Sequence, residues 1–531
     1  MDRNGRAVVD RQAAPPTRPM GLPLTHLTRL ESDSGPPTAP WPVAAGDTLR
    51  IEHPPARRRL ARWTGAGLAV TLGLGAAALA GPVTLPGTLD RFLGGGTASA
   101  SSPASDTRGQ VASLLTRLET ALRTGDAAAI AALVDPANPA LRERWTALPA
   151  RARAVGATTL RLGLAPGQLP AVRTTGLTAG YDRMIEIPVQ FGYTLAGWDR
   201  GPVTTVIALR LARSASTWRL VDDSGLAAAV PSAGPLEPWV AGSVDVVITP
   251  TVMVIGDPGR HRDNQRLATT LVEAVRDVRS AVPVQGWNGK VVAYASTRPE
   301  IVASWFGGRA ASEGRRAGAD PAAFAAEVRT LAGQVPTTTR GGEAGPMAAD
   351  RPAASRMAVT PFLLSRTDAR ARAVLRHEVT HVALTLDGEG QVPAWLVEGT
   401  AEYVAYRSVE NGHVSGLGAL DRRGLPTATW TQLRKRVWKP QLVADSAAFY
   451  TGTNAQVARH YTDAWLTCLY IAARHGENTL FQLYRAAASA PAGASSATTE
   501  ADALRAVLGM DQAELRRQAA AYARTLRTNF S

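Results

Sequence analysis

A chain of 531 residues, of which 45% are apolar, is too long for a single core, so we expect at least two domains. The net charge of +14 is carried almost entirely by arginine. Neither a basic stripe interleaved with aromatics nor a known nucleic-acid-binding motif accompanies this charge, so we predict no nucleic-acid partner. The densest basic run, Arg434–Lys439, is interpreted as a solvated face.

The chain has one cysteine, Cys468, within an apolar helical pattern. A single cysteine excludes an intrachain disulfide and a cysteine-based zinc site. Its apolar surroundings predict a buried, inert thiol.

The N-terminal region has the pattern of a membrane anchor. Residues 1–62 are rich in proline, arginine and small polar residues, which is typical of a disordered tail. Residues 63–86 carry no charge and provide about 20 apolar residues before Pro82, enough to cross a bilayer as a helix. Arginines at 57, 58, 59 and 62 stand immediately before this run. The positive-inside rule therefore predicts a single-pass protein of the cell membrane, with a cytoplasmic N-terminus and the rest of the chain outside.

Two other interpretations of the apolar run remain, a buried helix rich in alanine and glycine and a cleaved signal peptide. The triplet Ala98–Ala100 resembles a cleavage site but lies well past the run, and the preceding tail is too long for a signal peptide. We therefore favour the anchor. Residues 87–106, rich in glycine and serine, are predicted to be a flexible linker.

Residues 107–235 are predicted to form a small α+β domain. Leucines and a valine between Val111 and Leu122 recur at helical spacing, and a second helical segment follows over 127–134. Strand-like alternation comes next, at 184–189, 203–209 and 217–222. This order, helices before antiparallel strands, resembles the nuclear transport factor 2-like fold. No catalytic dyad is visible here, so the resemblance implies a binding or spacing module.

A linker at Pro231–Pro238 leads to a larger predicted domain, residues 236–531, also of α+β class. Strands are expected at 244–248, 252–255 and 290–294, and a helix at 265–278. Residues 308–356, rich in glycine, alanine and arginine, are predicted to include a mobile surface loop, which leaves open whether this loop covers a cleft as a lid. A short strand at 357–362 would be an edge strand able to pair with an extended peptide. The remainder is expected to be mainly helical.

The strongest chemical signal is the sequence His377-Glu378-Val379-Thr380-His381. Histidines four apart stand on the same face of a helix, so both imidazoles can reach one metal ion. Glu378 lies between them, close enough to take a proton from a water on that ion.

A second acidic motif follows, Trp395-Leu396-Val397-Glu398-Gly399. A helix beginning near Pro393 can run back beside the first and direct Glu398 at the histidine pair. His377, His381 and Glu398 would then hold the metal and leave one position for water, as in catalytic zinc sites. Glu402, one turn further, could hydrogen-bond a ligating histidine. The alternative in which Glu402 is the ligand and Glu398 its supporting carboxylate remains open.

These two motifs resemble those of the gluzincin metallopeptidases, in particular the "peptidase MA-like" family of clan MA. In that pattern the glutamate of Trp-Leu-x-Glu-Gly is the third zinc ligand. The resemblance covers about residues 240–531, and extends more weakly to Tyr461–Trp465 and to His475-Gly476-Glu477. It implies one zinc ion per chain and a peptide or protein substrate. An aminopeptidase is disfavoured, because the Gly-x-Met-Glu-Asn-type strand of the exopeptidase branch is not found.

The expected mechanism uses Glu378 as the general base for a zinc-activated water. The oxyanion needs a further donor, for which Tyr450, His460 and Tyr461 are candidates and Tyr461 is preferred. The two motifs, the family resemblance and the apolar run together predict a membrane-anchored zinc peptidase, most simply an endopeptidase. Two alternatives remain: a scaffold, zinc-binding or metal-free, that binds an envelope partner without catalysis, and a metallohydrolase that acts on a non-peptide substrate.

Overall fold

The computed structural model describes residues 103–526, with gaps at 166–168, 176, 178–179, 224–236, 284–285, 299–300, 302–332, 335–353, 360, 386–391 and 492–493. These residues all fall within one compact unit, 39–531. The predicted tail (1–62), the predicted membrane helix (63–86) and the first part of the linker lie outside the described residues. Within the described ranges, every helix is too short or too polar to cross a bilayer.

The first described elements are four helices: α1 (Pro103–Thr124), α2 (Ala127–Leu133), α3 (Pro139–Thr146) and α4 (Leu148–Ala154). The helix α1 begins inside the segment predicted as a flexible linker, so the linker prediction is wrong for its last four residues, 103–106, which are helical. A proline at the first position and Asp106 in the first turn are both favourable at a helix N-terminus. Asp126 and Asn138 cap α2 and α3 through their side chains, which accept backbone N–H groups.

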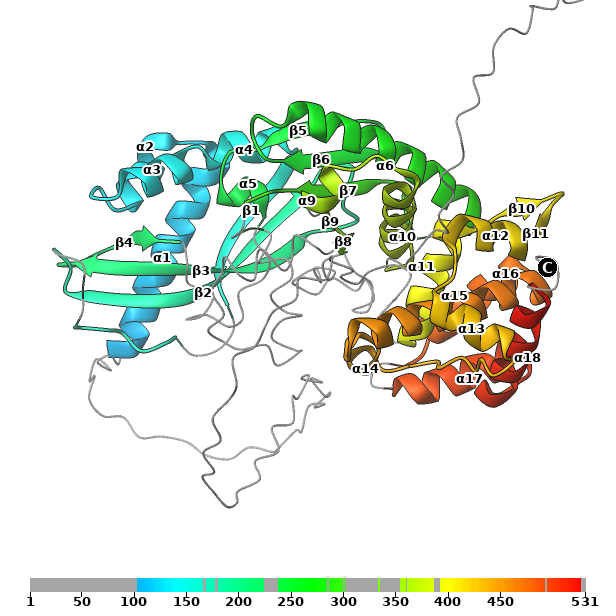
Figure 1. The fold of residues 1–531 in the computed structure, drawn as a ribbon. Coiled ribbons are helices and arrows are strands. Elements are labelled where there is room, and N and C mark those ends of the chain that lie inside the picture. Colours follow the sequence, from blue (N-terminus) through cyan, green and yellow to red (C-terminus); the bar gives the residue numbers. More distant parts are fainter. Residues whose placement is uncertain are drawn as a thin grey trace, which may run out of the picture. The chain divides into compact units, whose positions relative to one another are not determined.

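A four-stranded antiparallel sheet follows in simple meander order, β1-β2-β3-β4. Its strands are β1 (Ala157–Leu164), β2 (Arg183–Leu195), β3 (Val203–Ser214) and β4 (Thr217–Asp222). The long strands β2 and β3 alternate buried with half-buried residues, as a sheet with one face on a core requires. Figure 1 shows α1 crossing the direction of the strands, and the helix packs against β1 and β4.

A second, mixed sheet has the order β5-β6-β7-β9-β8. Its strands are β5 (Asp245–Ile248), β6 (Val252–Gly256), β7 (Val291–Ala295), β8 (Gly333–Gln334) and β9 (Met357–Val359). The central strands β6, β7 and β9 are parallel, and the strands at both edges are antiparallel to their neighbours. Two helices belong to this region, α5 (Pro238–Ala241) and the long α6 (His261–Ala281) that packs against β5 and β6.

The two faces of this central sheet belong to different cores. Val252, Val254 and Ala293 face α6 and the later helices, whereas Met253 and Tyr294 pack with the first sheet and its helices. Because neighbouring residues in a strand point to opposite faces, β6 and β7 must be apolar throughout, and all their residues are buried. The small N-terminal α+β region and the central sheet thus share one hydrophobic core.

The rest of the described chain is helical apart from a two-stranded ribbon, β10 (Val409–Glu410) and β11 (His413–Val414). Its helices are α9 (Pro361–Leu364), α10 (Ala369–Thr385), α11 (Ala394–Tyr406), α12 (Gly416–Arg423), α13 (Thr427–Arg434), α14 (Ser446–Tyr450), α15 (Asn454–His475), α16 (Glu477–Ala488), α17 (Ser496–Leu508) and α18 (Gln512–Thr525). The helix α10 packs against α6 and α11, and α11 packs in turn against α15 (Figure 1).

The predicted α+β class is confirmed, and so are the predicted strands and helices of both regions that lie in described ranges, except for part of the strand at 357–362. A strand is confirmed at Met357–Val359, whereas Pro361 starts α9. The prediction that this is an edge strand is wrong, because β8 pairs with its outer side. Most of the predicted 308–356 loop lies outside the described residues. Its last part differs from the prediction, because Ala354, Ser355 and Arg356 are buried.

Candidate metal centre

The first motif lies on α10. Asp368 precedes this helix and accepts the backbone N–H of Ala371 at 2.8 Å, which satisfies one of the donors left free at a helix start. His377, Glu378 and His381 lie in the second half of α10 and are all buried, with exposed fractions of 4%, 4% and 8%. Polar side chains at this depth are costly unless they are paired or bind a ligand.

The second motif lies on α11, in which all 13 residues are buried. Gly399 allows this depth, because a Cβ at that position would stand 2.7 Å from both the carbonyl oxygen of Ala464 and the sulfur of Cys468 on α15. The glycine therefore permits close packing of α11 against α15. Trp395 and Trp465 are core residues with no exposure.

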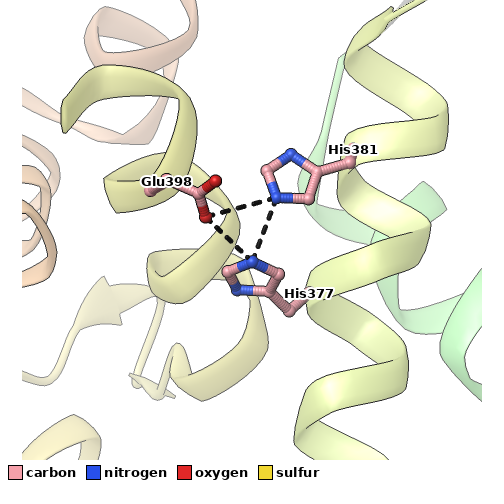
Figure 2. A group of neighbouring side chains, drawn as sticks. All are labelled: His377, His381 and Glu398. Atoms are coloured by element: carbon pink, nitrogen blue, oxygen red, sulfur yellow. Dashed lines mark hydrogen bonds and ion pairs between the residues drawn. The ribbon is translucent and has the colours of Figure 1, made fainter. Parts of the chain in front are cut away.

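The two helices bring three ligand atoms together (Figure 2). The Nε2 atoms of His377 and His381 are 3.0 Å apart, and Glu398 Oε2 lies 3.2 Å from the first and 3.4 Å from the second. A tetrahedral zinc ion with ligands at 2.0–2.1 Å requires its ligand atoms to be about 3.3 Å from one another. Two imidazole nitrogens and one carboxylate oxygen at these separations fit a zinc ion and leave further positions open.

His377 is held from behind by a carboxylate. Its Nδ1 atom lies 3.3 Å from Glu402 Oε1, and the other carboxylate oxygen of Glu402 accepts Arg423 Nε at 2.6 Å. A carboxylate on Nδ1 favours the tautomer with its proton there, which leaves the Nε2 lone pair for a metal. Glu398, not Glu402, thus faces both histidines, and Glu402 occupies the supporting position.

The tyrosine candidates lie on α14 and α15. The Tyr450 hydroxyl donates a hydrogen bond to Glu398 Oε1, the carboxylate oxygen that faces away from the histidines. The ring centroid of Tyr461 is 6.3 Å from that of His377 and 6.5 Å from that of Tyr450. His460 is turned elsewhere, with Nδ1 2.7 Å from the carbonyl oxygen of Phe449. Both tyrosines therefore belong to the site.

The electrostatics of the site favour a bound cation. Burial alone would raise the pKa of Glu398, but the facing histidines His381 and His377 hold it well below its usual range. Burial lowers the pKa of His377, but hydrogen bonds to Glu398 and Glu402 outweigh that effect and raise it to about 9. Without a metal, His377 therefore holds a proton between the carboxylates of Glu398 and Glu402. A metal cation can replace that proton.

Sequence reasoning named every ligand candidate at this site but missed Arg423. That residue is the last of α12, 21 positions beyond its partner Glu402, and no local motif marks it. Glu477, which stood in the weaker family motif, accepts hydrogen bonds from Tyr403 at 2.5 Å and from Arg407 at 2.9 Å. It ties the start of α16 to the end of α11.

Comparison with models of known protein families gives no match, and comparison with curated proteins gives no significant similarity.

Proposed function

We propose that the chain is a zinc-dependent peptidase in which His377, His381 and Glu398 hold the metal and Glu378 is the general base. The observation that carries the proposal is the convergence of two imidazole nitrogens and one carboxylate oxygen within 3.4 Å of one another, buried between α10 and α11. Zinc bound there would lower the pKa of a water and polarise a scissile carbonyl.

The side chains around the site have distinct tasks in this proposal. Glu378, adjacent to His377 and buried, takes the proton from the attacking water and passes it to the leaving amine. Tyr450 fixes the free oxygen of Glu398, which keeps the other oxygen directed at the histidines. Tyr461, whose ring lies beside His377, is the proposed donor to the oxyanion.

The resemblance to gluzincin peptidases supports a peptide or protein substrate, and the intact general base supports catalysis over a purely structural role. The proposed location is the outer side of a membrane, with residues 63–86 as a single anchor. This part of the proposal is supported by the uncharged run and the four arginines before it. Alkaline extraction of membranes, which releases peripheral proteins and retains anchored ones, tests it.

The test of the metal site measures zinc content and peptide-library cleavage of the full-length chain in mild detergent. Glu378→Gln should keep one zinc per chain and lose cleavage by about 10²–10⁴-fold, because it removes the base and not a ligand. His381→Ala should lose both zinc and cleavage. The exposed residues Glu410 and His413 provide matched controls, Glu410→Gln and His413→Ala, which should behave as the parent.

Three outcomes separate the alternatives. Zinc with no cleavage of any peptide would favour a zinc-binding scaffold, and cleavage of a non-peptide ester or amide alone would favour a different hydrolase. A parent chain without zinc would refute the proposal.

A further inference from the structure

The guanidinium of Arg423 is buried directly behind the metal centre. Its side chain is 2% exposed, and its partner Glu402 is fully buried. Nε donates to Glu402 at 2.6 Å, and Cζ of the guanidinium lies over the Trp465 ring, 4.5 Å from the ring centroid. Tyr406 provides a second aromatic ring at 5.8 Å. The cation is therefore held between aromatic rings and one carboxylate.

Two nitrogens of this guanidinium, Nη1 and Nη2, are buried and have no hydrogen-bond partner among the described residues. Leaving buried donors unsatisfied is unfavourable, and a buried ion pair is often no more stable than an apolar pair of the same size. Fold stability alone thus does not explain why arginine stands here. The hydrogen bond that Arg423 makes among the described residues goes to Glu402, the carboxylate that contacts His377. A role in the metal site therefore accounts for an arginine at this position.

The helix that carries Arg423 is docked tightly. At Gly416 a Cβ would collide with Tyr522 and Leu526 of the C-terminal helix region, and at Gly418 it would stand 2.5 Å from Ser408 Oγ. A larger residue at Gly416 or Gly418 would therefore require these neighbouring side chains to move. The close approach of α12 to its neighbours supports the position of Arg423 in addition to the contacts of Arg423 itself.

We propose that Arg423 is a positioning residue for metal binding that acts through Glu402. By holding Glu402 Oε2, it keeps Oε1 beside His377 Nδ1, so that the His377 ring stays in the orientation that directs Nε2 at Glu398 and His381. This inference rests on the proposed zinc site and adds a residue that lies outside both metal-site motifs of this sequence.

The experiment measures zinc affinity of the full-length chain by competition with a chromophoric chelator, independently of any activity. Supporting carboxylates and their partners typically contribute about 10–100-fold to metal affinity, so Arg423→Gln should weaken zinc binding by that order. Arg422→Gln is the matched control, because Arg422 is the exposed neighbour on the same helix. It should change the affinity by less than about twofold, as surface substitutions do.

A double-mutant cycle separates positioning from packing. Glu402→Gln should weaken zinc binding on its own, and adding Arg423→Gln to it should cause little further loss, because Arg423 acts only through Glu402. Loss of aromatic packing alone would instead add in full to the Glu402→Gln effect, and this result would overturn the inference.

Arg423→Lys covers the case in which Arg423→Gln does not fold. Lysine keeps the charge over Trp465 but lacks the planar group that fits Glu402, so an intermediate loss of affinity is expected. Parental zinc affinity in the folded Arg423 variants, with zinc bound normally by the parent, would refute the role of Arg423 and leave the metal site standing. A parent that binds no zinc would refute both.

Discussion

Two buried arginines, Arg356 and Arg423, are embedded in opposite kinds of network. Arg356 lies between the two sheets, where all three guanidinium nitrogens donate. Nη1 and Nη2 contact the two carboxylate oxygens of Asp199 at 2.6 and 2.9 Å, and Nε contacts the Tyr294 hydroxyl at 3.0 Å. Glu237 completes the network as acceptor of the Tyr193 and Tyr294 hydroxyls. Burial raises the pKa of Glu237 above its ordinary value, against the opposing effect of Arg356 and the two tyrosine hydroxyls.

Arg423 makes, within the described part of the chain, a single hydrogen bond to a carboxylate, and its Cζ atom lies over an indole ring. The Arg356 network pairs all of its guanidinium nitrogens and joins the two sheets. The Arg423 network leaves Nη1 and Nη2 without partners among the described residues, and through Glu402 it contacts His377, whose ring we propose it positions. The comparison shows that burial alone does not indicate the role of a charged side chain. Its hydrogen-bond partners, and the donors that have none, are more informative.

The largest expected effect on stability follows from removing Arg356, the cation of the network between the two sheets. Arg356→Ala leaves Asp199 buried without its cation, which should lower the free energy of unfolding by about 3–5 kcal/mol. Chemical denaturation measures the change, and Arg276→Ala, at a side chain that is 75% exposed, is the control. Zinc affinity of the folded fraction should be unchanged. A loss of zinc affinity as large as that of Arg423→Gln would remove the distinction between the two networks.

The second prediction concerns pH. The ordinary pKa of a histidine is 6.5 and that of His377 is raised to about 9, so the folded state binds this proton more tightly than the unfolded state. The resulting stability is complete below pH 6.5 and is lost as the pH rises to about 9. Chelator-treated protein should therefore lose roughly 1 kcal/mol per pH unit across this window.

Thermal unfolding at several pH values measures this loss, and His377→Gln should abolish it whereas His413→Ala should not. Zinc affinity should rise over the same window, because zinc and the proton compete for Nε2. A flat profile in the metal-free parent would contradict the raised pKa.

A third prediction tests how closely the ligand helix must pack. Gly399→Ala places a methyl group against the backbone oxygen of Ala464, which should destabilise the chain by about 1–3 kcal/mol and displace Glu398 enough to weaken zinc binding. Gly163→Ala is the control, since nothing lies within 4 Å of a Cβ at that position. Parental stability and zinc affinity for both variants would show that α11 and α15 separate at no cost.

The smallest effect is expected one turn before Glu398. Trp395 Nε1 donates to Glu500 at 2.7 Å, and Gln512 donates to the same carboxylate oxygen. Gln512→Ala removes one of these two bonds at a half-buried position while the bond from Trp395 remains, so a loss of about 1 kcal/mol in unfolding free energy is expected. Zinc affinity should stay at the parental value, and a large drop would place this contact with the site rather than with the core.

The parts of the fold that the sequence predicts are those with strong local signals. The alternation in β2 and β3 and the helical spacing in α1 and α6 can be read without knowing the partner elements. The missed elements, α3, α4 and β1, are short or interrupted; in β1 the pairing with β2 shifts register between Thr158 and Arg161. The strand β8 has only two residues, and no period can be read from two residues.

The ligand candidates could be found because their spacing along the sequence places the side chains on the facing sides of two helices, where they can reach a single metal ion. The two buried arginines could not be found in this way, because their partners are distant in sequence: Arg423 meets Glu402 across 21 positions and Arg356 meets Asp199 across 157. The shared core between the first region and the central sheet is equally invisible, since an apolar strand does not say what covers each of its faces.

The contact between Gly399 and Cys468 gives the helical half an internal reporter. The thiol is fully buried, and burial raises its pKa well above the ordinary value, so neither access nor ionisation favours attack by an alkylating reagent in the folded chain. As Cys468 is the single cysteine of the sequence and its sulfur stands against Gly399 of α11, alkylation requires an opening of the core that exposes this thiol. The labelling rate therefore reports how often the packing around the helix that carries Glu398 opens, without any substitution or added probe.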